Sequence, residues 1–234
     1  MPTCLTLRAE LLAMQAEDSR VRAQLLQTGQ LSNGYNSEIA AVHGRNAARL
    51  REVIAQYAWP TRTLVGVDGE EAAWLILQHG IGDPDLQRSS VPLLEKAVAE
   101  TEAPTWQLAY LTDRIAFFEG RPQRYGTQFD YDDQGYTVVY RLEDPERVDQ
   151  LRRSVGLEPL GDRLLPRVRQ TPVEPEKLRE YRAGYEHWSK VVGWRRYRGC
   201  QALREPFKEQ QNLGGFEERA ASRVVFIGVS HDLT

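Results

Sequence analysis

The sequence predicts a mainly α fold (α+β), namely a helical domain with a small antiparallel β-hairpin and a C-terminal helix-strand extension. Apolar residues recur at three- and four-residue spacing through most of the first 120 residues, which is typical of amphipathic helices. Two short alternating segments, 125–129 and 136–140, flank a run of turn formers and predict one hairpin. A chain of 234 residues is long enough to bury a core without disulfides or metals.

Three helices are expected in the first 80 residues. The first spans about 6–26 and ends at a turn-forming cluster. The second runs from about 39 to 59, is stopped by Pro60 and is followed by a loop over 59–66. The third covers about 70–79, and its centre, AAWLIL, is apolar on every side. A helix of that kind is expected to be buried all round.

Two more helices, about 91–102 and 105–119, precede the hairpin. After the hairpin, the pair Asp144-Pro145 opens a short helix, because Asp is a good N-cap and Pro fits the first helical position. This helix completes a core domain over residues 1–160.

The C-terminal part is expected to differ from the core domain. Residues 161–176 are basic and rich in proline, which predicts a linker. Residues 177–234 form an extension whose helix needs a partner, either the core domain, where it would close over the 123–128 loop, or another subunit. The segment 224–229 is apolar enough for a terminal strand. One face of the extension helix carries Leu178, Tyr181, Tyr185, Trp188 and Val192.

Composition excludes several classes of protein. A net charge of -3 argues against a general nucleic-acid binder, and no apolar run approaches the roughly 20 residues of a membrane span. The two cysteines are far apart and suit reduced thiols, so a cytoplasmic location is expected. Only four of the 30 basic residues are lysine, which indicates a high-GC bacterium.

Three residues are the candidates for acid/base catalysis. His79 ends a buried helix and titrates near neutral pH, although a helix-end histidine can also be a dipole-stabilised cation. Asp113 lies between two apolar stripes of its helix, so its carboxylate needs a buried partner. The structural alternative is that Asp113 caps a neighbouring helix or pairs with a structural arginine. Arg114 would hold an anionic group.

The segment 120–129 is dense in hydrogen-bonding side chains. In a strand that starts at Tyr125, Gly126 and Gln128 share one face, and Thr127 lies on the other. A glycine beside an amide lets a ligand approach the backbone closely. The alternative is an ordinary hairpin with a polar outer face.

Four segments resemble, in this order, a bacterial domain family of unknown function catalogued as six-six-two-four: WPTRTLVG, AAWLILQHG, LTDRIAFFEGRPQRYGTQF and LEDPERVDQLRRSVGLEPL. The resemblance covers about residues 1–160 and implies no assigned reaction. It implies a shared polar site at Gln78, His79, Asp113, Arg114, Gln123, Tyr125 and Gln128. With Thr127 added, we expect catalytic roles for His79, Asp113 and Arg114, and substrate binding by Gln78, Gln123, Tyr125, Thr127 and Gln128.

No cofactor or metal site is predicted from local spacing. The chain has no GxSxG elbow, no GxGxxG or Walker loop, and no histidine pair at metal-ligand spacing. The run Trp194-Arg195-Arg196-Tyr197-Arg198 is of a kind that can hold phosphates or stacked bases, but a solvated or interface-facing helix end is the simpler interpretation.

These observations favour a cofactor-independent acid/base enzyme that acts on a small polar metabolite, anionic or carrier-bound, in bacterial specialised metabolism. The reaction would be cyclisation, elimination or hydrolysis; one form is intramolecular displacement of a sulfate or phosphate by a deprotonated amine. The protein would contribute mainly orientation. The alternative is a non-catalytic ligand-binding or partner-stabilising protein, with a protein partner or a second copy docked on the C-terminal extension.

Overall fold

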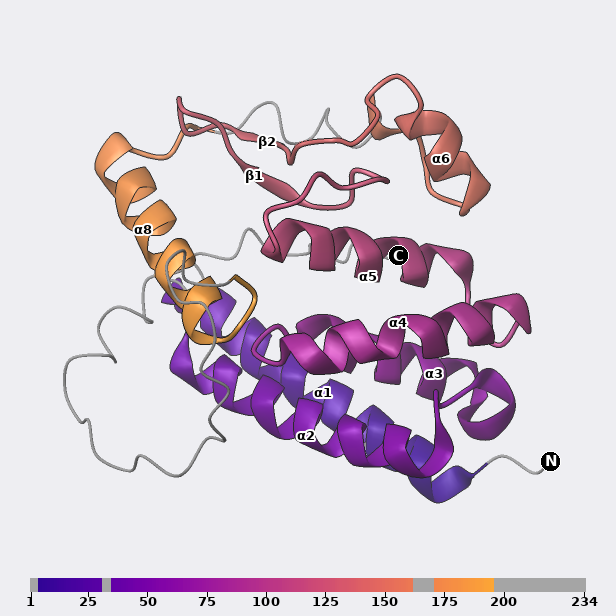
Figure 1. Cartoon of the computed structure of the whole chain (residues 1–234). Helices are drawn as coiled ribbons and strands as arrows, with labels where there is room; N and C mark the ends of the chain where they lie inside the picture. The colour runs from indigo at the N-terminus through magenta and orange to yellow at the C-terminus, as the bar shows by residue number, and fades with distance from the viewer. Residues whose placement is uncertain (1–3, 31–34, 162–170, 196–234) are drawn as a thin grey trace, which may run out of the picture.

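The computed structural model describes residues 4–30, 35–161 and 171–195 and confirms a mainly helical fold with one small antiparallel sheet (Figure 1). None of the helices in this described part is long and apolar enough to cross a membrane. The elements are α1 (Leu5–Gln27), α2 (Ser37–Tyr57), α3 (Arg62–His79), α4 (Pro84–Ala99), α5 (Thr105–Phe118), β1 (Phe129–Tyr131), β2 (Thr137–Val139), α6 (Val148–Ser154) and α8 (Pro175–Val191).

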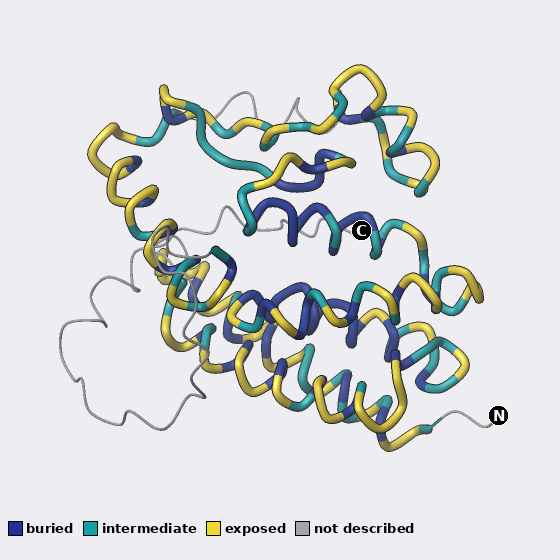
Figure 2. The backbone as a smooth tube through the Cα atoms, viewed as in Figure 1, coloured by how far each residue is buried: buried dark blue, intermediate teal, exposed yellow. Residues whose placement is uncertain are grey.

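Helix α3 forms the centre of the helical layer. It packs against α1, α2 and α4, and α5 packs on α4 (Figure 1). The hairpin and α6 lie on the side of α5 that faces away from α1 and α2. As expected from the apolar run AAWLIL, every residue from 72 to 79 is buried, and Figure 2 shows the buried backbone concentrated in α3 and α5.

Two helices begin earlier than the sequence predicts, because each has a cap outside the apolar run. Helix α3 starts at Arg62, where the Thr61 side chain accepts a hydrogen bond from the Leu64 N–H. The expected loop over 59–66 is therefore partly helical, with a kink at Gly66, whose φ of 79° is non-helical. Helix α4 starts at Pro84, one position after its N-cap Asp83.

The hairpin is shorter than predicted. Its antiparallel register pairs Phe129 with Val139 and Tyr131 with Thr137. Residues 125–128 do not form a strand, because Gly126 has a φ of 67° and the backbone N–H groups around it donate to a side chain of α5. After the hairpin, α6 starts at Val148 and not directly after Asp144-Pro145.

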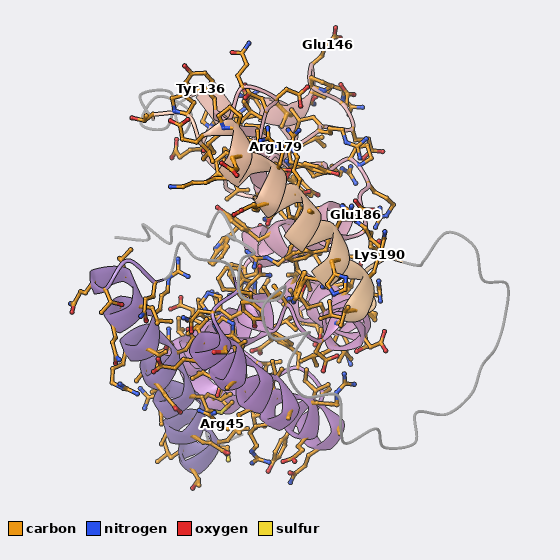
Figure 3. The ribbon with its side chains drawn as sticks, turned by 90° about the vertical axis from the view of Figure 1, so that its left-hand side faces the viewer. Arg45, Tyr136, Glu146, Arg179, Glu186 and Lys190 are labelled. Carbon is orange, nitrogen blue, oxygen red and sulfur yellow. The ribbon has the colours of Figure 1, made fainter. Side chains whose placement is uncertain are left out.

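Helix α8 connects the hairpin to the end of the helical layer. Tyr181 donates a hydrogen bond from its hydroxyl to Asp130 of β1, and Tyr185 donates to the Phe117 carbonyl of α5. Further along, the Trp188 ring lies 5.9 Å from that of Tyr35, just before α2. The charged residues Arg179, Glu186 and Lys190 lie along the outer side of α8 (Figure 3). The expected strand at 224–229 and residues 196–198 lie outside the described residues.

Removing the Trp188 side chain tests how much the helical layer depends on α8. Trp188 is 5% exposed and contacts Phe118 as well as Tyr35, so Trp188→Ala should lower the free energy of unfolding by about 3–5 kcal/mol. The matched control is Val191→Ala on the same helix, where the side chain is exposed; it should change stability by less than about 0.5 kcal/mol. Urea denaturation followed by circular dichroism measures both. Equal effects would show that α8 is not part of the core.

A carboxylic acid is buried in α3 away from the predicted site. Glu70 is fully buried and accepts hydrogen bonds from the Trp59 indole N–H at 3.2 Å and the Gln107 amide at 3.1 Å. Burial raises the pKa of Glu70 to about 7, because two neutral donors and the Arg62 guanidinium, 4.0 Å away, do not replace the water around a carboxylate. Glu70 therefore loses its proton at a higher pH in the folded protein than in the unfolded chain.

This raised pKa predicts a pH dependence of stability. Between pH 4.5 and 7 the folded protein keeps a proton that the unfolded chain releases, so the contribution of Glu70 falls by about 3 kcal/mol over this window. Glu70→Gln should remove that decline, and Glu71→Gln, at the exposed neighbouring position, should retain most of it, because the Glu71 charge is the smallest influence on the Glu70 pKa. Urea denaturation at pH 5, 6 and 7 measures the difference. Parallel pH profiles for wild type and Glu70→Gln would contradict the assignment.

Candidate functional site

The eight predicted site residues divide into two groups with different surroundings. Successive helical residues point about 100° apart, and Asp113 and Arg114 are neighbours on α5. The Asp113 carboxylate meets the loop before the hairpin, whereas Arg114 Nη1 donates to the Gln78 carbonyl at the end of α3. Asp113 bonds to the backbone of this loop, whereas His79 Nδ1 lies 2.7 Å from Asp18 of α1.

The Asp113 carboxylate holds the loop of residues 124–127. It accepts hydrogen bonds from the backbone N–H groups of Arg124, Tyr125 and Thr127 at 2.8–3.1 Å, and from the Thr127 hydroxyl at 3.0 Å. Burial raises the pKa of Asp113, and these hydrogen bonds oppose that effect. These contacts favour the structural alternative for Asp113, although the partner is a loop backbone and not the helix end or arginine considered from the sequence.

Gln123 and Gln128 extend the same loop network. The Gln123 amide donates to the carbonyls of Gln128 and Tyr140, and its oxygen accepts from the Gln128 N–H. The Gln128 amide in turn donates to the Thr127 hydroxyl. These side chains cross-link the loop to the strand region that follows it, so the Gln123 amide is fully engaged within the protein and the Gln128 side chain is engaged through its Nε2 atom.

An open cleft borders this loop. It has a volume of about 510 Å³ and is lined by Asp113 and Tyr125 together with charged residues of both signs. The guanidinium of Arg124 lies 5.6 Å from the centre of the Tyr125 ring. Of the five predicted residues in this region, Tyr125 offers its side chain most directly to a ligand, because it is only half-buried.

His79 belongs to a second, buried cluster between α1, α2 and α3. His79 Nδ1 lies 2.7 Å from Asp18 Oδ2, and His43 Nε2 lies 3.4 Å from the same oxygen. The Tyr35 hydroxyl lies 2.9 Å from His43 Nδ1. Asp18 is 1% exposed, and His43 and His79 are 7% and 9% exposed. The carboxylate and both imidazoles are therefore buried, and Tyr35 beside them is only partly buried.

The charges of the cluster determine where its protons lie. Burial opposes ionisation of Asp18, but hydrogen bonds and charge from His43 and His79 keep the pKa of Asp18 below its ordinary value. An ionised carboxylate only accepts hydrogen bonds, so His79 Nδ1 carries a proton. Burial lowers the pKa of His79 and favours the neutral ring, which makes Nε2 its basic nitrogen.

Arg114 and Gln78 complete this buried cluster. Arg114 is 5% exposed, and burial lowers its pKa to about 10, with a further lowering by the neighbouring Arg22. Its Nε and Nη2 atoms have no hydrogen-bond partner, and neither does the amide of the fully buried Gln78. Buried polar groups are normally paired. The structure thus brings two predicted side chains, those of His79 and Arg114, to one buried polar cluster, which Gln78 joins through its backbone carbonyl.

Asp18, His43 and His79 could also hold a metal ion. One ligand atom from each side chain lies within 4.8 Å of the others, and two histidines with one carboxylate suit a divalent transition metal. The positive charges of Arg22 and Arg114 oppose a bound cation, because Arg22 interacts electrostatically with Asp18 and Arg114 with His79. Local spacing could not reveal this set, since each ligand comes from a different helix.

Sequence reasoning did not select Asp18, His43 or Tyr35. A signal was present: Asp18 falls seven residues from both Leu11 and Leu25, on the buried stripe of α1. A carboxylate on an apolar stripe needs a buried partner, by the reasoning that was applied to Asp113. His43 likewise lies on the buried face of α2.

The family model described as a family of unknown function (DUF6624) matches residues 5–168. The chain belongs to this family. The match spans both polar clusters but ends before α8. No curated protein and no solved structure matches the chain.

Asp113→Asn tests the structural role of the loop network. The new amide group would place a donor where backbone N–H groups donate, so the free energy of unfolding should fall by about 2–4 kcal/mol. Asp133→Asn, at an exposed position in the hairpin turn, is the control and should change stability by less than about 0.5 kcal/mol. Urea denaturation gives both values. An unchanged stability of Asp113→Asn would overturn the structural role.

Proposed function

We propose that this chain is a cofactor-independent acid/base enzyme that acts on a small polar metabolite at the buried cluster around His79. The observation that carries the proposal is the Asp18–His79 hydrogen bond of 2.7 Å inside a buried polar cluster that contains an arginine without partners on two of its nitrogens. Buried carboxylates and arginines reduce stability unless they are paired, and such arrangements occur chiefly at functional sites.

In the proposed mechanism, His79 is the general base. Asp18 accepts a hydrogen bond from the Nδ1–H group and thereby orients the ring, with the basic Nε2 toward the substrate. When Nε2 takes a proton from the substrate, the imidazolium is stabilised by the adjacent carboxylate. His43 is a positioning residue, because it lies beside Asp18 and is held by Tyr35 on its other ring nitrogen. The reaction classes that fit are cyclisation, elimination and hydrolysis.

Arg114 and Gln78 are the proposed binding residues. Their unpartnered atoms offer donors and one amide acceptor to a polar ligand. We include in the proposal a cytoplasmic setting in bacterial specialised metabolism, a small-molecule partner and no nucleic acid, supported by the net charge of -3 and the sparse cysteines. In this proposal the loop network is scaffold and does not contact the substrate; its members are Asp113, Gln123, Thr127 and Gln128.

The proposal predicts that turnover depends on His79 and not on a metal. Purified full-length protein, dialysed against EDTA, is incubated with a small-molecule extract of a high-GC bacterium, and mass spectrometry records which compounds are consumed. We expect at least one compound to be consumed by wild type and by the exposed-histidine control His187→Gln. His79→Gln should slow consumption by a factor of about 100 or more, because it lacks the base.

The melting temperature of each variant is measured alongside turnover. A folded His79→Gln variant with full turnover would contradict the general-base role, and turnover that returns only with one divalent ion would contradict the cofactor-independent mechanism. A compound that binds without being consumed would favour the alternative, a non-catalytic ligand-binding protein.

A further inference from the structure

We infer that Arg114 is the anchor of a buried oxyanion site, so the ligand of the cluster carries a carboxylate, sulfate or phosphate group. The ligand class applies to the site proposed above. That the anion is a substrate rests on the proposed function, whereas anion binding by Arg114 does not. The observations that carry it are the hydrogen bonds that Arg114 does and does not make, and the charges around it.

One edge of the Arg114 guanidinium is without a partner. Nη1 donates to the Gln78 carbonyl at 2.8 Å, whereas Nε and Nη2 make no hydrogen bond. These two nitrogens form the side of the guanidinium whose parallel N–H bonds match the two oxygens of an oxyanion. The residue is 5% exposed, so bulk water does not solvate this edge. An unpaired guanidinium edge is costly to bury.

Other arginines of the same chain show what this edge binds. Arg8 uses Nε and Nη2 to hold both oxygens of Asp68, at 2.8 and 2.6 Å. Arg49 uses the same two nitrogens on the oxygens of Glu10, at 2.6 and 3.0 Å. Both pairs are partly exposed. At Arg114 the same edge is much more deeply buried, and no carboxylate of the described residues occupies it.

The charges of the cluster favour an anion. Asp18 is its one carboxylate among the described residues, and Oδ2 of that carboxylate already faces His79 and His43. Arg22 and Arg114 contribute two guanidinium groups. The charge of Arg22 lowers the pKa of Arg114, and the charge of Asp18 acts on Arg22. A bound oxyanion would balance the second guanidinium.

Anion titrations test the site on the full-length protein. The melting temperature is followed in increasing sodium sulfate, sodium phosphate or sodium acetate, with sodium chloride holding the ionic strength constant. We expect a saturable rise with at least one anion. The lowest midpoint with acetate would identify a planar carboxylate as the preferred group, and with sulfate or phosphate a tetrahedral one.

Variants assign the effect to Arg114. Arg114→Lys keeps the charge but loses the two-nitrogen edge, so the midpoint should rise at least tenfold. Arg152→Lys is the control matched for burial, because Arg152 is 1% exposed and bonds to the Tyr125 and Glu158 carbonyls; its midpoint should not change. Equal midpoints in wild type and Arg114→Lys, or no saturable rise in wild type, would overturn the inference.

A crystal structure of the wild-type protein with selenate keeps the test decisive if Arg114→Lys does not fold. Selenium is located by its anomalous scattering, and we expect it within bonding distance of Arg114 Nε and Nη2; selenate found only elsewhere would overturn the site. Anion binding that depends on Arg114, together with full turnover by His79→Gln, would leave this site standing and contradict the general-base role.

Discussion

The Asp113 carboxylate fixes the loop of residues 124–127 on α5, and the hairpin that follows this loop depends on that attachment. A carboxylate buried against α5 is stable only if donors surround it, and the backbone of residues 124–127 supplies them. Because these N–H groups must point at the carboxylate, the chain departs from strand geometry at Gly126, and the loop fixes where the hairpin begins. The position of the hairpin then determines where α8 can bind, because α8 reaches β1 through the Tyr181–Asp130 hydrogen bond.

The same chain of contacts reaches the histidine cluster. At the other end of α8, Trp188 packs on Tyr35, and Tyr35 holds His43 next to Asp18. The loop network of Asp113 and the cluster of His79 are therefore connected through packed aromatic side chains. The family match ends at residue 168, before α8, so the covering of this end of the helical layer is supplied by residues outside the family model.

The two polar clusters differ in how completely they are paired. Around Asp113 the carboxylate oxygens and the facing N–H groups all have partners, as expected where a polar group serves the fold. Around Arg114, two guanidinium nitrogens and the Gln78 amide have none. Incomplete pairing in a buried cluster lowers stability, and natural proteins accept that cost chiefly where a ligand restores the pairing. This contrast supports the proposal that the Asp113 network belongs to the scaffold and the Arg114 cluster to the site.

Local sequence patterns determined the helices, the hairpin and the burial of α3, because periodicity, caps and turn residues act over a few positions. They also singled out His79, Asp113 and Arg114 as polar residues among apolar neighbours. Only the tertiary structure decided which of them lie together. Asp113 and Arg114 are adjacent in sequence, but their directions on α5 send one to the hairpin loop and the other to α3. Asp18 and His43 join His79 from 61 and 36 residues away, and such pairings depend on how three helices pack, which no local spacing encodes.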